Sequence, residues 1–391
     1  GSRYEPSNLA GASHLLEHMM FKGTKKRPSA EALSRVLDAY GADYNAYTGK
    51  DHTGYYVKIA GNQFQVGLDL VHDMVFNSEH RAAELAKEKP VVVEEIKMYE
   101  DNPRMHVGDL MEQALFSGTT LGRNIAGSQQ SVLEMKRSGL LRFRNDYYVP
   151  ERIVVVLSGK FSQEAERQAE KLFGSIYPSK LPPAGFEPVP GAAPEMLAVN
   201  LQNKTTEQIQ LALGFRGLPY NHKKLPALRL LSVILGEGMS SRLFVAVRVK
   251  NGLAYSVGMQ AASYEDTGVV DIEAGLDKSK LDRALLIIRK EIEGIKKQGP
   301  TSEELRRAKN HLAGRTLLAM EDCAVRAEWF GSQALFTPSE IQTPEQKLKK
   351  IQAVTKAEVQ EIAREILDFK RLAVGIVGPF ASPREVKKYF N

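Results

Sequence analysis

Two stretches of this 391-residue chain repeat each other at a nearly constant distance along the sequence. Residues 152–161 resemble residues 371–380, since each is an apolar run that ends in Gly-x-Phe. Upstream, the sequence Gln-Ala-Leu-Phe of residues 113–116 occurs again at residues 333–336. The two pairs are offset by 219 (371 against 152) and 220 residues (333 against 113). Such repetition predicts a duplicated α+β unit, each copy a mostly antiparallel sheet covered by helices.

A stretch rich in Pro and Gly, residues 178–194, separates the two copies and has little capacity for regular structure. We therefore predict a first half over 1–177, a linker over 178–194 and a homologous second half over 195–391. The second half opens with two apolar strands before a helix near Leu225, and the first half has no counterpart to them. We expect that the sequence begins about 25 residues inside the natural domain, with a sheet edge missing.

Local patterns in the first half predict helices and one hairpin. Apolar residues at helical spacing indicate helices, and short aromatic-rich runs around a Gly-containing turn indicate a β-hairpin. The expected helices are an opening helix that ends at Gly23 and helices at about 33–40, 62–77 and 83–100, and the expected hairpin pairs 43–48 with 53–59. Pro90 should kink or restart the last of these helices, because it lacks an amide donor.

Composition excludes several classes of protein. The net charge is +6, but Lys and Arg are mixed with Asp and Glu, so a nucleic-acid-binding surface has little support. Cys323 is the only cysteine, which excludes an internal disulfide and fits a reducing compartment. The sequence contains no apolar run of about 18 residues, which is the length that would predict a membrane span. We expect a bacterial cytoplasmic protein; the mitochondrial matrix and the periplasm stay open, because a targeting segment could precede Gly1.

Near the start, the chain reads His14-Leu-Leu-Glu17-His18. Side chains four residues apart lie on one helix face, so the two histidines can hold one metal ion with a carboxylate beside them. Catalytic zinc takes three protein ligands and leaves a position for water. The alternative is an amphipathic helix with two hydrogen-bonded structural histidines.

The acidic helix at 83–100 can supply a third ligand. Seven-residue spacing places Glu88 and Glu95 on nearly one face, whereas Glu94 points about 100° away. This geometry favours Glu95 over Glu94, the alternative being that the acids form a solvated face. In the second half no histidine lies between 225 and 244, and at the offset of 220 residues Arg315 stands opposite Glu95, so the same site cannot form there.

Several ordered motifs together resemble a known family. They are residues 1–6, 11–24, 45–48, 93–103 and 121–123. The chain resembles the inverzincins, the pitrilysin and insulin-degrading-enzyme family, and within it the short branch of the mitochondrial processing peptidase and its bacterial relatives. The likeness spans essentially the whole chain.

This resemblance implies roles for individual residues. It implies that His14, His18 and Glu95 bind one Zn²⁺, that Glu17 is the general base, and that Glu88 orients a ligand or supports the base. The resemblance also implies that Arg248 holds the substrate backbone and that Tyr255 stabilises the oxyanion. Without the resemblance, we would interpret Tyr255 as a buried aromatic residue of a strand and Arg248 as a cation at a helix end. A strand containing Asn45, Ala46 and Tyr47 resembles the edge strand that pairs with an extended substrate.

The expected function is therefore a zinc endopeptidase, an oligopeptidase or processing peptidase, that acts on unfolded or extended peptides enclosed between two chains. A homodimer is the natural assembly, because one chain carries both residue sets, although a heterodimer with a non-catalytic paralogue fits as well. The alternative hypothesis is that the chain is a non-catalytic core or scaffold subunit of the same family. Such subunits typically have a degraded metal-binding motif.

Overall fold

The computed structural model describes residues 1–176, 185–190 and 197–390, so most of the predicted linker lies outside the described residues. The chain divides into two compact units, each drawn from separate segments of the sequence. Unit 1 comprises Gly1–Lys97, Arg123–Glu187 and Ala319–Ile341, and unit 2 comprises Met98–Gly122, Pro188–Leu318 and Gln342–Asn391. The exchanged segments Met98–Gly122 and Ala319–Ile341 are 221 residues apart at their starts (319 against 98) and 219 at their ends (341 against 122). This reciprocal exchange follows the offset of the sequence repeat.

Unit 1 is mainly helical and contains one antiparallel hairpin. Its elements are α1 (Ala12–Met20), α2 (Ala30–Ala39), β1 (Asp43–Thr48), β2 (Thr53–Lys58), α3 (Phe64–Asn77), most of α4 (Ala82–Asp101), α6 (Gln129–Glu134), α7 (Arg137–Tyr147), α8 (Gln163–Phe173) and α12 (Cys323–Phe336). The predicted helices and hairpin of the first half are therefore confirmed, to within a few residues at their ends.

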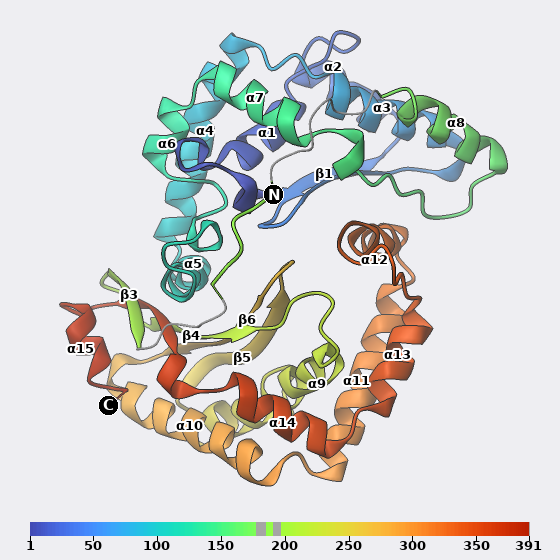
Figure 1. Ribbon diagram of the computed structural model, residues 1–391. Helices are drawn as coiled ribbons and strands as arrows, with labels where there is room; N and C mark the ends of the chain where they lie inside the picture. Colours follow the sequence, from blue (N-terminus) through green and yellow to red (C-terminus); the bar gives the residue numbers. More distant parts are fainter. Residues whose placement is uncertain (177–184, 191–196, 391) are drawn as a thin grey trace. The chain divides into compact units, whose positions relative to one another are not determined.

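Helix α1 lies in the core of unit 1. Leu15, Leu16 and Met19 are fully buried and pack with apolar residues of α4, α6 and α7. A second cluster joins α2 to α3 through Leu33, Leu37, Leu70 and Met74 (Figure 1). Burying such side chains is the main stabilising term of a fold, so the helix that carries the two histidines is held on several sides.

Unit 2 is built on a five-stranded sheet. Its elements are α5 (Pro103–Leu115), β3 (Ala198–Asn203), β4 (Ile209–Gly217), α9 (Leu225–Leu235), β5 (Ala254–Ser263), β6 (Gly268–Leu276), α10 (Leu281–Gln298), most of α11 (Ser302–Ala319), α13 (Pro344–Ala353), α14 (Lys356–Ile366), β7 (Ala373–Gly378) and α15 (Pro383–Lys387). The strand order is β3-β7-β4-β6-β5, and only the β3–β7 pair is parallel. The predicted α+β class is confirmed, and this sheet is mostly antiparallel as predicted, whereas the described residues of unit 1 contain a two-stranded hairpin and no larger sheet.

The two faces of this sheet pack against different helices. Along β4, Leu211, Leu213 and Phe215 contact the core formed with α9, α10 and α14, whereas Ala212 faces α5 (Figure 1). This alternation is the period of two that a strand imposes. α5 can approach the sheet closely because residue 375 is a glycine. A Cβ at this position would lie 2.4 Å from the carbonyl oxygen of Val107.

One expectation from the sequence is wrong, because a predicted strand is absent, and a second is wrong in part, because α4 does not restart at Pro90. Residues 153–158 form no strand, although their repeat 373–378 forms β7. β7 pairs with both β3 and β4, whereas no described strand pairs with residues 153–158. Helix α4 also continues through Pro90 without a restart. Both Pro90 and Ala86 are exposed, so water can satisfy the Ala86 carbonyl that loses its amide donor.

None of the described helices is both long enough and apolar enough to cross a lipid bilayer.

Candidate metal centre

The N-terminal end of α1 is fixed by a buried carboxylate. Glu5 accepts hydrogen bonds from the backbone amides of Gly11, at 2.7 Å, and Ser13, at 2.6 Å. These amides lie at the start of the helix, where no intrahelical partner exists. Gly11 has a φ of 91°, and a Cβ there would lie 2.4 Å from the carbonyl oxygen of Ala126, so only glycine fits. The helix that carries the histidines therefore begins at a defined place.

Three predicted ligands meet in unit 1. The Nε2 atom of His14 lies 3.7 Å from Oε1 of Glu95, and the Nε2 atom of His18 lies 3.3 Å from Oε2 of the same carboxylate. One ligand atom from each of the three residues falls within 4.8 Å of the others. Ligand atoms bound tetrahedrally to zinc lie roughly 3.3 Å apart, so the donor set has the size and chemistry that a zinc ion needs. Among the described residues this is the one such group of three or more.

The neighbouring acids of α4 have different environments. Glu94 is 72% exposed in its side chain and pairs with Lys97 at 2.8 Å, which places it away from the histidines. Glu88 is 5% exposed, and its Oε1 accepts a hydrogen bond from Nδ1 of His18 at 2.9 Å. This contact fixes a proton on Nδ1, so Nε2 is the nitrogen of His18 that faces Glu95 and can bind a metal once its own proton is displaced.

Charge at the centre depends on these carboxylates. Burial lowers the pKa of His18, but hydrogen bonds to Glu88 and Glu95 outweigh it and raise that pKa to about 9. Burial and the nearby His18 lower the pKa of His14. The His18 bond, together with the charges of both histidines, lowers the pKa of Glu95 despite burial. A metal must displace the proton on Nε2 of His18, so its binding releases a proton.

Glu17 stands on α1 between the two histidines in sequence and contacts the hairpin. The hydroxyl of Thr48, at the end of β1, donates to Oε2 of Glu17 at 2.5 Å. Burial raises the pKa of Glu17, and the hydrogen bond from Thr48 and the charge of His18 only partly oppose that rise. A carboxylate with a raised pKa beside a metal site is suited to accept and return a proton.

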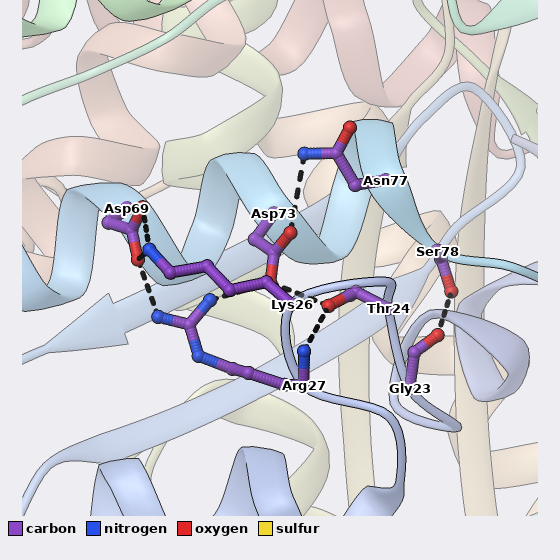
Figure 2. Close-up of polar contacts among 8 residues, drawn as sticks. All are labelled: Gly23, Thr24, Lys26, Arg27, Asp69, Asp73, Asn77 and Ser78. Atoms are coloured by element: carbon purple, nitrogen blue, oxygen red, sulfur yellow. Dashed lines mark hydrogen bonds and ion pairs between the residues drawn. The ribbon is translucent and has the colours of Figure 1, made fainter.

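The loop after α1 is tied to α3 by a polar network (Figure 2). Thr24 and Arg27 both donate to Oδ2 of Asp73, at 2.7 and 2.5 Å, and Arg27 also pairs with Asp69. The hydroxyl of Ser78 donates to the carbonyl of Gly23 at 3.4 Å and to that of Met19, the penultimate residue of α1, at 3.0 Å. The C-terminal end of α1 is therefore as firmly placed as its start.

The predicted substrate strand is β1. It pairs with β2 alone among the described strands, with Asn45 opposite Tyr56 and Ala46 opposite Tyr55. The Oδ1 atom of Asn45 accepts a hydrogen bond from the amide of Ala46 at 2.9 Å. A peptide that pairs with this strand must use other amides or displace that contact.

Arg248 and Tyr255 lie in unit 2 and contact each other. The Arg248 guanidinium lies 5.2 Å from the centre of the Tyr255 ring, within the range of a cation–π contact. Arg248 belongs to a π-helical segment, Phe244–Val249, and Tyr255 is 67% exposed on β5. The alternative without the family resemblance is therefore right that Tyr255 lies on a strand and wrong that it is buried. Tyr255 also lines a polar cavity of about 380 Å³ together with Glu207, Asp277 and Lys280.

Three contacts at this centre were not expected from the sequence: Glu5 with the amides of α1, Thr48 with Glu17, and Lys22 with Glu88. Each joins residues far apart along the chain or caps a helix from outside it. A local pattern carries no signal for such contacts.

A duplicated α+β chain with an inverted His-x-x-Glu-His helix and a glutamate from a following helix defines the class of the inverted-motif metallopeptidases. Comparison with known proteins agrees. Residues 1–129 match the family model "Insulinase (Peptidase family M16)", and residues 135–312 match "Peptidase M16 inactive domain". The chain belongs to peptidase family M16, which confirms the resemblance seen in the sequence.

Relatives align over nearly the whole chain. An uncharacterized zinc protease of Bacillus subtilis, YmxG, is 36% identical over 97% of this chain and 91% of its own length. An uncharacterized zinc protease of Streptomyces coelicolor is 34% identical over 97% of this chain and 83% of its own. A protease from Helicobacter pylori has the same fold, with a TM-score of 0.89 at 22% identity over 97% of this chain and 91% of that one.

Proposed function

We propose that the chain is a zinc-dependent endopeptidase that hydrolyses peptide bonds in unfolded or extended peptides, as an oligopeptidase or processing peptidase. The observation that carries this proposal is the meeting of His14, His18 and Glu95 around one point, with Glu17 on the same helix. The names of the relatives, which call them zinc proteases, support it.

His14, His18 and Glu95 would hold one zinc ion per chain. When bound, the zinc would polarise the scissile carbonyl and lower the pKa of water. Glu17 accepts the proton of the attacking water and returns it to the leaving amine. The hydrogen bond from Thr48 keeps the Glu17 carboxylate in one orientation for both transfers. Glu88 holds the imidazole of His18 in the tautomer whose Nε2 is free.

In this proposal residues 1–177 form the metal-binding half and residues 195–391 the half that carries Arg248 and Tyr255. A second copy of the chain would supply its Tyr255 hydroxyl to the oxyanion and its Arg248 to the substrate backbone. The exposure of Tyr255 and its contact with Arg248 support such a role. The assembly would be a homodimer, the alternative being a heterodimer with a non-catalytic paralogue.

Asn45, Ala46 and Tyr47 would bind substrate through the backbone of β1. An edge strand pairs with any extended peptide and reads its shape more than its sequence. The substrate class is therefore a peptide that lacks stable structure. The single cysteine is compatible with the bacterial cytoplasm as the site of action.

The test is a pair of variants assayed on an unstructured fluorogenic peptide. Glu17→Gln should abolish hydrolysis and keep one zinc per chain by metal analysis, because it removes the base and leaves the three ligands. Glu94→Gln is the matched control on α4 and should keep activity. If the wild-type chain binds zinc but cleaves no peptide, the hypothesis of a non-catalytic scaffold subunit replaces the proposal. Full activity in zinc-loaded Glu17→Gln would refute the mechanism.

A further inference from the structure

Lys22 is the second residue after the end of α1 and carries a contact that the mechanism above does not use. Its Nζ lies 2.5 Å from Oε2 of Glu88, while Oε1 of the same carboxylate accepts from His18. The ammonium, the carboxylate and the imidazole therefore form one continuous chain. His18 reaches Glu88 from α1, and Lys22 reaches it from the turn that follows this helix.

The buried carboxylate needs a cation. Glu88 is 5% exposed, and a buried charge without a partner is strongly unfavourable. A metal on Nε2 of His18 leaves that imidazole neutral, so His18 then provides a hydrogen bond and no charge. Among the described residues, Lys22 is then the one cation that pairs with Glu88. Without it, the carboxylate would gain by turning toward water and would leave Nδ1 of His18 without its acceptor.

The backbone at Lys22 is held in place. Its amide donates to the carbonyl of Met19 at 3.2 Å, and the next residue, Gly23, accepts from Ser78. The network of Figure 2 then anchors Thr24 and Arg27 to α3. The ammonium therefore extends toward Glu88 from a fixed base.

We propose that Lys22 is a positioning residue of the metal centre, which keeps Glu88 against His18 and so keeps Nε2 of His18 available to zinc. This rests on the proposed role of His18 as a zinc ligand. Partners that orient a ligating histidine typically change metal affinity by about 10- to 100-fold when removed. Lys22 acts through one such partner, so Lys22→Met should raise the dissociation constant for zinc about tenfold.

The experiment measures zinc affinity of the full chain, stripped of metal, by competition with a chromophoric chelator. Lys22→Arg keeps a cation and should restore most of the affinity. Lys26→Met is the matched control, because Lys26 lies in the same loop and pairs with Asp69 on α3. Its affinity should equal that of the wild type. In a Glu88→Gln background, Lys22→Met should add little, since both changes remove the same support.

The outcomes separate this inference from the proposed function. A wild-type chain that binds no zinc overturns both. A wild-type chain that binds zinc, together with Lys22→Met of equal affinity, overturns the role of Lys22 alone. Additive losses in the double variant also overturn it, because Lys22 would then act without Glu88. Circular dichroism of each metal-free variant checks folding, and Lys22→Gln replaces Lys22→Met if the latter unfolds.

Discussion

The contact between Thr48 and Glu17 allows a quantitative prediction about catalysis. Thr48→Val keeps the shape of the side chain and removes the hydroxyl that donates to Oε2 of Glu17 at 2.5 Å. A hydrogen bond to a charged group contributes about 1.5 to 3 kcal/mol. At about 1.4 kcal/mol per pKa unit, its loss should raise the pKa of Glu17 by about 1 to 2 units. Burial already raises that pKa, so the substitution adds to an existing shift.

The sign follows from the role of the base. Glu17 must be ionised to accept a proton, so activity falls as the pH drops through its pKa. The acid limb of kcat/KM should therefore move to higher pH in Thr48→Val, by about 1 to 2 units. The assay is cleavage of a fluorogenic peptide across about pH 5 to 9 with zinc content verified. Thr48→Ser keeps the hydroxyl and should follow the wild-type profile. A Thr48→Val profile that superimposes on the wild type would refute the reasoning.

Two further predictions concern stability. Asp73 is 3% exposed and accepts hydrogen bonds from both Thr24 and Arg27. Asp73→Ala should therefore lower the free energy of unfolding, measured by chemical denaturation, by about 3 kcal/mol. Asp69 is more exposed, so Asp69→Ala should lower it by less than about 1 kcal/mol. An equal effect of both would contradict the network of Figure 2. Burial lowers the pKa of His80 from 6.5 to about 4, so its stabilising contribution is complete above about pH 6.5 and is lost as the pH falls toward 4. His80→Asn, which tolerates the φ of 46°, should flatten the fall of melting temperature over this range, and an unchanged fall would exclude His80 as its cause.

The residues proposed as metal ligands could be selected from the sequence in part because some of their signals are local. His14 and His18 lie four apart, and Glu95 lies seven after Glu88, so helical periodicity favours these residues, and the resemblance to the inverzincins implies the full set. The exposed position of Glu94 agrees with that periodicity. Whether α1 and α4 meet depends on the packing of Leu15, Leu16 and their neighbours, which periodicity does not describe.

Other parts could not be predicted, for physical reasons. Residues 153–158 have the apolar composition of a β-strand, but a strand forms only where an adjacent strand supplies backbone hydrogen bonds. The helix-breaking tendency of Pro90 was outweighed because apolar residues on both sides of it, such as Leu85 and Val92, pack into one core. The π-helical turn at Arg248 and the contact of Thr48 with Glu17 depend on tertiary packing.

The exchange of segments between the two units sets the order in which they can be completed during synthesis. Unit 1 begins at Gly1 and includes Ala319–Ile341, so a ribosome must add most of the chain before α12 exists. Unit 2 takes α5 from the first half, so residues 195–391 expressed alone would lack the helix that covers one face of their sheet. Contacts this distant along the chain slow folding and leave apolar surface exposed for longer. The segments of unit 1 that come first along the chain therefore cannot complete their packing until Ala319–Ile341 has been synthesised.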